Sequence, residues 1–302
     1  MKKISVVISA FNEEEKITEC LESVKWADEI ILVDNESTDK TVEIAKNHTS
    51  NIISRKNNLM LNVNKNFGFT KASGDWILCL DADERVSSEL KNEIKLTIEK
   101  DTEVMGYFIP RKNIIFTKWI KHTGWYPDYQ SRLFKNGKGK FAEKHVHEMI
   151  EIEGKTEYLK ENLIHYNFES ISQFLHKHIN IYAPNEVDNI IAGGYKFDYL
   201  DAIRFPIKEF LSRFFAREGY KDGLHGLVLS LFMAFYHFII FAYLWEKQGF
   251  PSVEKNNFLQ EMRGEFKKIN KDIMFWFSNE QTKMIKNPLI KILHKVRKKL
   301  LK

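Results

Sequence analysis

The chain has 302 residues, of which 43% are hydrophobic, 13% aromatic and 29% charged. Because apolar residues are plentiful and there are only 14 glycines and 6 prolines, this composition excludes an intrinsically disordered or collagen-like protein. The two cysteines, Cys20 and Cys79, exclude a disulfide scaffold and a four-cysteine zinc site, and they fit a reducing compartment.

The formal net charge of +5 is unevenly distributed along the chain. Residues 246–302 hold 14 Lys and Arg against 6 Asp and Glu, a balance of +8, whereas residues 1–245 hold 32 against 35, a balance of −3. A slightly acidic body with a basic tail predicts an anionic partner surface for the tail.

The N-terminal residues predict a buried strand over Ile4–Ser9 rather than a signal peptide, because the apolar run is short and no small-residue cleavage site follows it. Asn12 is expected to cap the next helix, whose buried face has a spacing of i, i+3, i+4 and i+7 and consists of Ile17, Cys20, Leu21 and Val24. Further strands are expected over 29–34, 52–54, 76–80 and 107–110, and further helices over 41–46, 63–72 and 87–100.

Strands and helices that alternate in this way predict an α/β fold, a three-layer sandwich with a mainly parallel central sheet. Ligands of such sheets bind at the carboxyl ends of the strands. Three strand ends, at 10–12, 34–37 and 81–83, carry polar or acidic residues, so an acidic site is expected there. No GxGxxG or GxxxxGK[ST] pattern follows the first strand, which argues against a dinucleotide-binding enzyme and a P-loop NTPase.

The triplet Asp81-Ala82-Asp83 follows the strand expected over 76–80. If the strand continues through it, both carboxylates leave on the same side, where they suit Mg²⁺ or Mn²⁺ together with the phosphates of a substrate. Such an ion would stabilise a departing diphosphate. The alternative is that Asp81, Asp83 and Glu84 merely begin the next helix.

The sequence resembles glycosyltransferase family 2 in SVVISAFNEE at 5–14, ADEIILVDNESTD at 27–39 and GDWILCLDADER at 74–85. More narrowly, it resembles the bacterial lipopolysaccharide-core beta-1,4-glucosyltransferase branch over about residues 1–246. The narrower match rests on GWYPDYQSRLF at 124–134, VHE at 146–148, LIHY at 163–166, GYKDG at 219–223 and LWE at 244–246.

This resemblance implies a GT-A fold and an enzyme that transfers a hexose, commonly from UDP-glucose, with inversion and a divalent metal. The implied acceptor is a lipopolysaccharide-core or other lipid-linked glycan. Where this chain has Asn35-Glu36 the family usually has small residues, so the donor base is left open. The implied nucleotide-sugar site consists of Phe11, Asn12, Glu13, Asp34, Lys65, Asn66, Asp81 and Ala82, and the implied metal ligands are Asp81, Asp83 and His165.

Inversion requires a base that deprotonates the acceptor hydroxyl. Glu148 and Asp128 are the two candidates. Glu148 could instead be a strand carboxylate paired with Lys144, and Asp128 could position an acceptor hydroxyl. His165 could equally be a core histidine. Three aromatic residues are candidate sugar platforms or simply core: Trp119, Trp125 and Tyr126.

Residues 223–245 contain no Asp, Glu, Lys or Arg and are long enough to span a membrane, but both flanks are basic. Residues 282–302 carry eight Lys and Arg and no acid, with an apolar helical stripe, which is typical of a membrane-surface helix. We therefore expect a cytoplasmic enzyme, peripheral on the inner face of the membrane, rather than a single span. No nucleic-acid partner is expected, and the C-terminal helices could supply a homo-oligomer interface.

The expected organisation is a catalytic domain over 1–200, an apolar, aromatic-rich helical region over 201–250 and a basic amphipathic helical tail over 251–302. Two other functions are compatible with the sheet and its carboxylates. A sugar nucleotidyltransferase typically has a basic, glycine-rich loop after the first strand, whereas Ala10–Glu15 is acidic and lacks glycine. A non-catalytic membrane-associated adaptor would keep the fold without binding nucleotide.

Overall fold

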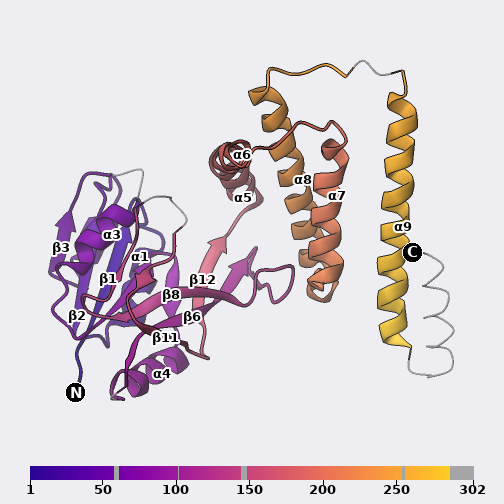
Figure 1. Ribbon diagram of the computed structural model, residues 1–302. Coiled ribbons are helices and arrows are strands. Elements are labelled where there is room, and N and C mark those ends of the chain that lie inside the picture. Colours follow the sequence, from indigo (N-terminus) through magenta and orange to yellow (C-terminus); the bar gives the residue numbers. More distant parts are fainter. Residues whose placement is uncertain (58–60, 101, 144–147, 254–255, 286–302) are drawn as a thin grey trace. The chain divides into compact units, whose positions relative to one another are not determined.

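The computed structural model describes residues 1–57, 61–100, 102–143, 148–253 and 256–285. The chain divides into two compact units. The sheet unit comprises 1–119 and 126–167, and the helical unit comprises 120–125 together with the chain from residue 168 (Figure 1). Predictions that concern Lys144, the Val146-His147 pair or residues 286–302 lie outside the described residues.

One half of the main sheet is parallel. Its strands are β1 (Ile4–Ala10), β2 (Glu29–Asp34), β3 (Asn51–Ser54) and β4 (Trp76–Asp81), in the order β3-β2-β1-β4. All seven residues of β1 are buried, as expected for a strand that is covered on both faces. In register, Ala10 pairs with Asp34 and Ser9 with Asp81, so these strands end at one edge.

The other half of the sheet is largely antiparallel. The order continues from β4 to β8 (Asp128–Lys135), β6 (Val104–Ile115), β12 (Leu163–Phe168) and β5 (Glu84–Val86). β8 is antiparallel to both β4 and β6. Two further strands pair with β6, namely β7 (Lys118–Trp119) and β11 (Lys155–Tyr158), while β9 (Gly139–Lys140) and β10 (Glu151–Ile152) form a separate ribbon.

Helices cover both faces of the sheet, which makes three layers (Figure 1). α1 (Ile17–Val24) and α4 (Ser88–Ile98) bury their apolar stripes in one core cluster. α3 (Leu61–Phe69) packs on the opposite face, where Phe69 joins Val7, Val33 and Phe134. Gly68 allows this close approach, since a Cβ there would lie 2.6 Å from Val7 Cγ1. The short α2 (Thr41–Ala45) follows β2.

The helical unit contains α5 (Ile171–Lys177), α6 (Ala183–Ala192), α7 (Asp201–Leu211), α8 (Leu224–Lys247) and α9 (Phe258–Met284). Two π-helical turns, His178–Tyr182 and Ser212–Ala216, extend α5 and α7, and a 3₁₀ turn, Gly219–Asp222, precedes α8. By length and composition α8 alone, among the described residues, qualifies as a membrane span, and 44% of its most apolar window is buried in the protein.

The structure confirms the predicted fold class and the buried face of α1. Two local predictions are wrong. Asn12 does not cap α1, because the N-cap is Lys16 and Asn12 has a φ of 53° in the loop before it. β4 ends at Asp81 and Asp83 lies in a turn, so the two carboxylates do not leave one continuous strand. The strand expected over 107–110 is longer, over Val104–Ile115. The division at residues 200 and 250 stays a prediction.

Candidate functional site

The carboxyl edge of the parallel strands is organised by a buried asparagine. Asn35 follows β2 and donates from Nδ2 to Ser9 Oγ (2.9 Å) and Ala10 O (2.8 Å) at the end of β1. Its Oδ1 accepts a short hydrogen bond from Asn64 Nδ2 of α3. The side-chain amide of Asn35 thus connects the ends of β1 and β2 to α3, which covers one face of the sheet. The sequence pattern drew attention to the acids at this edge but assigned Asn35 no role.

The predicted nucleotide-binding residues of the first two strand ends lie together. Asn12 Oδ1 accepts from Thr38 N (2.8 Å), and Glu13 N donates to Thr41 Oγ1 (2.8 Å). Asp34 is buried and accepts from Ser37 N at 3.2 Å, while the ring of Phe11 is 41% exposed. The loops after β1 and β2 therefore form one polar surface with an exposed aromatic ring. The assignment of these residues to a nucleotide stays a prediction.

Asp81, at the end of β4, is held by two cations. Lys65 of α3 pairs with Oδ1, and Arg132 Nη2 of β8 lies 2.5 Å from Oδ2. Burial by itself raises the pKa of Asp81, but the charges of Arg132 and Lys65 outweigh it and hold the pKa well below its usual value. Asp81 is therefore an ionised carboxylate in a partly buried ion-pair cluster.

The edge is consequently less acidic than the sequence pattern indicated. Among the described residues four acids gather there, but Lys65, Arg132 and Arg111 neutralise most of their charge. The two arginines come from β6 and β8, which are distant in sequence from Asp81, Asp83 and Glu84, so the local pattern around these three acids gave no signal for them. The four acids are Asp81, Asp83, Glu84 and Asp128.

A chain of polar contacts leads from Arg111 to Asp83. Arg111 donates to Asp128 Oδ2 from Nε (2.8 Å), with Nη2 at 2.7 Å, and Asn113 Nδ2 donates to the same oxygen at 3.1 Å. The Oδ1 of Asn113 lies 2.6 Å from His165 Nδ1, and His165 Nε2 lies 3.5 Å from Asp83 Oδ2. Because Asp128 accepts from the amide NH₂, Asn113 must present its oxygen to His165.

This orientation fits a cation beside Asp83. With Nδ1 facing Asn113, the other ring nitrogen of His165, Nε2, faces the Asp83 carboxylate, and although burial raises the pKa of Asp83, a hydrogen bond from His165 helps to lower it. An imidazole nitrogen and a carboxylate are also the kinds of group that ligate a divalent metal ion. In addition, Asp83 Oδ1 is buried and has no hydrogen-bond partner among the described residues. Three His, Cys, Asp or Glu side chains do not converge on one point anywhere in the described ranges. The structure thus brings Asp83 and His165 together but keeps Asp81 in its ion pairs.

The two predicted bases lie in different surroundings. Asp128 accepts hydrogen bonds from Arg111 and Asn113, as described above, and also from Gln130 Nε2 at 2.8 Å. Burial raises the pKa of Asp128, but the charge of Arg111 and the hydrogen bonds from Asn113 and Gln130 lower it overall. Glu148 is partly exposed and accepts from Glu143 N (2.8 Å) and from Asn62 Nδ2 of α3 (3.4 Å).

α3 contributes the other polar contacts near Glu148. Asn66 Nδ2 donates to Phe141 O (2.9 Å) and Glu143 Oε1 (2.7 Å), and Asn66 Oδ1 accepts from Phe141 N (2.8 Å). α3 therefore holds the segment after β9 and the buried ion pair through Lys65 at the same time. This places the predicted Lys65 and Asn66 on one helix, with Asn66 engaged by protein groups.

The three candidate sugar platforms do not form one group. Trp119 and Tyr126 pack edge to face in the sheet unit, with ring centroids 5.5 Å apart. Trp125 belongs to the helical unit, where it packs on Phe168 and beneath the guanidinium of Arg213. Whether any of them binds a sugar stays a prediction.

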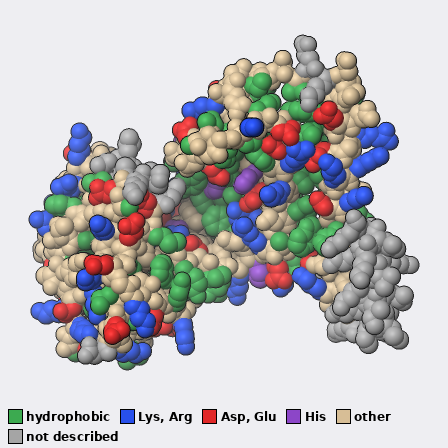
Figure 2. Space-filling view, in the orientation of Figure 1, with side chains coloured by type: hydrophobic (Ala, Val, Ile, Leu, Met, Phe, Trp, Pro, Cys, Tyr) green, Lys and Arg blue, Asp and Glu red, His purple; other side chains and the backbone are tan. Residues whose placement is uncertain are grey.

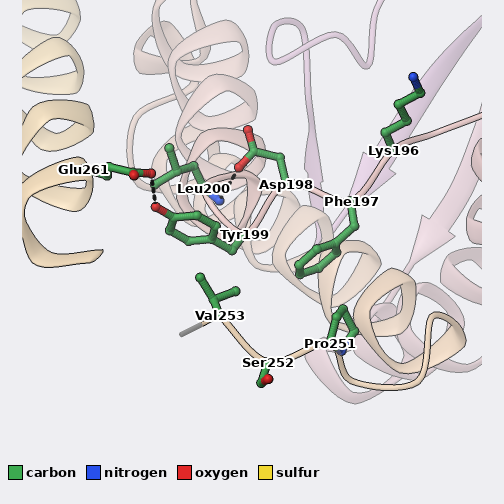
Figure 3. Close-up of a pocket in the computed structure, with 9 residues that line it drawn as sticks. All are labelled: Lys196, Phe197, Asp198, Tyr199, Leu200, Pro251, Ser252, Val253 and Glu261. Atoms are coloured by element: carbon green, nitrogen blue, oxygen red, sulfur yellow. Dashed lines mark hydrogen bonds between the residues drawn. The ribbon is translucent and has the colours of Figure 1, made fainter. Parts of the chain in front are cut away.

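The helical unit has a pocket of its own, with a volume of about 550 Å³ (Figure 3). The hydroxyl of Tyr199 donates to Glu261 of α9 at its wall, and Asp198 accepts from Leu200 N (3.0 Å). It contains none of the predicted site residues. Its lining consists of Lys196, Phe197, Asp198, Tyr199, Leu200, Pro251, Ser252, Val253 and Glu261.

Comparison with known proteins identifies the class of enzyme. The sequence profile of "Glycosyl transferase family 2" matches residues 5–151. An uncharacterized glycosyltransferase of Rickettsia typhi is 32% identical over 258 residues, which cover 82% of this chain and 88% of the relative. The protein is therefore a glycosyltransferase. More particularly, it belongs to glycosyltransferase family 2, as its strand-end motifs indicate.

Three further comparisons have lower identities. The lipopolysaccharide core biosynthesis glycosyltransferase LpsC of Rhizobium meliloti is 24% identical over 254 residues, covering 82% of this chain and 93% of LpsC. Among solved structures, S. aureus TarS 1–349 with UDP covers 82% of this chain and 92% of its own, with 17% identity and a TM-score of 0.40. Glucosyl-3-phosphoglycerate synthase of Mycobacterium tuberculosis, with Mn²⁺ and UDP-glucose, covers 37% and 43%, with 23% identity and a TM-score of 0.31.

Proposed function

We propose that this enzyme transfers a hexose, glucose from UDP-glucose, to a lipopolysaccharide-core or other lipid-linked glycan, with inversion at the anomeric carbon. The observation that carries the donor half is the juxtaposition of His165 with Asp83, whose Oδ1 has no hydrogen-bond partner among the described residues, next to the ion-paired Asp81 at the carboxyl edge of the sheet. The relationship to LpsC supports the acceptor class. The donor sugar, its base and the acceptor are proposals.

On the donor side, the loops after β1 and β2 bind the nucleotide. The exposed ring of Phe11 and the polar groups of Asn12 and Glu13 line its pocket, and the buried carboxylate of Asp34 accepts a hydrogen bond from the base. Asp81 and Ala82 border the ribose. Lys65 and Asn66 of α3 lie on the diphosphate side, where the diphosphate competes with Asp81 for the ammonium of Lys65.

Asp83 and His165 are the residues that would hold Mg²⁺ or Mn²⁺, with the diphosphate oxygens as further ligands and Asp81 close by in sequence. When bound, such an ion neutralises the charge that develops on the leaving diphosphate. Asn113 fixes the ring of His165 through Nδ1, and Asp128 fixes Asn113, so the ligand is oriented before the donor arrives.

Glu148 is the proposed general base. It takes the proton of the acceptor hydroxyl as that oxygen attacks the anomeric carbon from the face opposite the diphosphate, and the bond to the diphosphate breaks. Asp128 is a weaker base because its pKa is lowered by Arg111 and by two amide donors. We therefore assign Asp128 the role of orienting Arg111 and Asn113.

An anionic membrane surface is the proposed location of the acceptor. The exposed residues Leu224, Leu231, Phe235, Phe238 and Trp245 of α8 fall within about 80° of the helix circumference, opposite its buried face. Apolar and basic side chains lie side by side on the visible face of the helical unit (Figure 2). Such a stripe suits insertion at the headgroup level while lysines contact anionic lipid.

The donor proposal is tested by Mn²⁺-dependent UDP-glucose turnover and by Mn²⁺ binding in the presence of UDP. Asp83→Ala is expected to lower both by more than about tenfold. The control Asp188→Asn alters an exposed carboxylate of α6 and should change neither. Unchanged turnover in Asp83→Ala would refute the metal-binding role.

The base is tested with Glu148→Gln and Asp128→Asn. We expect Glu148→Gln to lower kcat by about 10² or more with little change in the KM for the donor, because only the proton acceptor is lost. Asp128→Asn should lower the affinity for Mn²⁺ as well, since it loosens Asn113. If Asp128→Asn alone abolishes kcat and leaves Mn²⁺ binding intact, the roles are reversed.

Thermal-shift measurements with UDP, GDP and Mn²⁺ separate the alternatives. A shift with UDP and Mn²⁺ supports UDP-glucose as the donor. A shift with GDP but not with UDP would instead indicate a donor with a guanine base, and no shift with any nucleotide favours a non-catalytic adaptor. A sugar nucleotidyltransferase would release pyrophosphate from a nucleoside triphosphate and a sugar phosphate, which a pyrophosphate assay detects.

Lipid binding is tested by co-sedimentation with vesicles of phosphatidylcholine, with and without phosphatidylglycerol. Phe235→Ser/Phe238→Ser should weaken binding to the anionic vesicles by about tenfold, because two aromatic side chains no longer enter the interface. Leu96→Ser, at an exposed apolar residue of α4, is the matched control. Equal binding of both variants would contradict the assignment of α8.

A further inference from the structure

A six-residue segment of the chain leaves one unit for the other. Ile120–Trp125 belongs to the helical unit, although Trp119 before it and Tyr126 after it belong to the sheet unit. Two consecutive residues of this excursion have positive φ, Thr123 at 58° and Gly124 at 83°. For Thr123 this conformation is costly, so it persists only because surrounding contacts impose it.

Asp222, the last residue of the 3₁₀ turn before α8, supplies the central contact. Its carboxylate accepts from His122 N at 2.8 Å and from Lys121 N at 3.4 Å, and it lies 3.1 Å from His122 Nδ1. The residue is 4% exposed. A buried carboxylate that receives the donors of two successive residues fixes the backbone there as well as the side chain.

Neighbouring residues enclose the rest of the excursion. Arg213 Nη1 donates to Thr123 O (2.8 Å), and Thr123 N donates to Arg217 O (3.0 Å). A Cβ on Gly219 would lie 2.4 Å from Thr123 Cγ2, so a glycine is required where Thr123 packs. The GYKDG motif at 219–223 thus binds the excursion through Asp222 and Gly219. The proposed donor site assigns this motif no role.

The polypeptide that follows the excursion reaches the candidate active site within three residues. Only Tyr126 and Pro127 separate Trp125 from Asp128, the first residue of β8. Asp128 holds Asn113, which in turn orients His165. The carboxylate on which these contacts depend is therefore only three peptide bonds from the end of the excursion.

We propose that Asp222 is a positioning residue for the transfer reaction. By fixing Ile120–Trp125 in the helical unit, it fixes the start of β8 and, through Asp128, the orientation of Asn113 and His165. The kinetic part of this inference rests on the proposed function. The structural part does not.

Amide hydrogen exchange tests the structural part. In Asp222→Asn, exchange of the amides at 121–123 and at 128–131 should accelerate by about tenfold or more, while β1 and β2 exchange as in the wild type. Glu265→Gln is the matched control, since Glu265 is another buried carboxylate of the helical unit, paired with Arg204. Unchanged exchange at 128–131 in Asp222→Asn, or an equal increase in Glu265→Gln, overturns the inference.

Kinetics with UDP-glucose and Mn²⁺ test the consequence. Asp222→Asn should lower turnover by about tenfold while the KM for the donor stays within about threefold, and Glu265→Gln should change neither. His122→Ala should lower turnover in the same direction, and adding it to Asp222→Asn should cost little more, because both remove one contact. Additive losses, or turnover in Asp222→Asn equal to the wild type, contradict a positioning role.

Gly219→Ala provides a second route that leaves the charge of Asp222 intact. Its Cβ collides with Thr123, so it should reproduce the exchange pattern of Asp222→Asn even if that variant folds poorly. If the wild-type protein transfers no sugar but exchange at 128–131 responds as expected, the proposed function fails and the positioning of β8 by Asp222 stands.

Discussion

Arg132 and Glu84 form a buried ion pair, with Arg132 Nη2 2.8 Å from Glu84 Oε1 and the side chain of Glu84 fully inaccessible. The same nitrogen lies 2.5 Å from Asp81 Oδ2. Glu84 also accepts from the backbone N of Asp81 at 3.0 Å, so it closes the turn after β4. Arg132 of β8 therefore joins the antiparallel half of the sheet to the end of the parallel half.

We expect Arg132→Met to lower the free energy of unfolding by about 3–5 kcal/mol, because it removes the nearest cation from Glu84 and one of the two cations that pair with Asp81. The buried Glu84 then keeps Arg111 Nη1, at 3.7 Å. Urea denaturation of the two proteins measures this. The control Lys138→Met removes one partner of an exposed pair with Glu153 and should cost less than about 1 kcal/mol. Similar losses in both variants would show that the burial of Glu84 carries no energetic weight.

Gly68→Ala should destabilise the sheet unit by about 1–3 kcal/mol, because the new Cβ overlaps Val7 and Val33 and pushes α3 away from the sheet. Donor binding should weaken too, since Lys65 moves with the helix. Gly264→Ala in α9 is the counterpart. There a Cβ meets no atom within 4 Å, and helix propensity predicts a gain of up to about 1 kcal/mol. Thermal unfolding of the two variants compares the two effects, and a stabilised Gly68→Ala would contradict the packing of α3.

The stability of the helical unit should fall as the pH drops below the usual pKa of histidine. His178 is stacked on Phe174, with ring centroids 3.9 Å apart, and burial lowers its pKa to about 4 from 6.5. Since the unfolded chain binds the proton more tightly, stability is lost as the pH falls from about 6.5 toward 4 and levels off below that.

Between pH 7.5 and pH 5 this loss amounts to about 2 kcal/mol for His178. His178→Gln keeps a donor for Phe174 O but does not titrate, so the difference between the two proteins isolates the contribution of His178. Urea denaturation at both pH values gives it. A difference that does not change with pH would mean that His178 is protonated as easily in the folded protein as in the unfolded chain.

Both cysteines should be unreactive in the folded protein. Burial raises the pKa of Cys79 to about 11 and raises that of Cys20 further, so thiolate is scarce at pH 8. A chromogenic disulfide reagent should label two thiols within minutes after denaturation in guanidinium and few before it. Rapid labelling of the native protein would place at least one thiol at the surface.

Local sequence patterns were sufficient for the parallel half of the sheet. Apolar β-branched runs predicted β1 and β2, and helical spacing predicted the buried face of α1, because these elements bury their side chains in a periodic way. The family resemblance, which the comparisons confirmed, also rests on local patterns. Its motifs lie at the strand ends, and the register of the parallel strands brings those ends to one edge.

Local reasoning failed where a distant group determines the conformation. Asn12 is a residue type that often caps helices, yet its side-chain oxygen accepts a hydrogen bond from Thr38 N, because the loop after β2 offers a donor there. The strand pattern also carried β4 through Asp83, whereas Glu84 closes a turn after Asp81.

The sequence by itself determined the family, the order of the elements and the residues available at the strand ends. Tertiary structure decided the charge of the site, because Arg111 and Arg132 arrive from antiparallel strands that no local period relates to the acids they neutralise. It also decided the place of Asp222, whose contacts with His122 join residues 100 apart in the chain. The spacing of apolar residues reflects which face of a single helix or strand is buried. Ion pairs and polar contacts between elements depend instead on which distant segments the tertiary fold brings together.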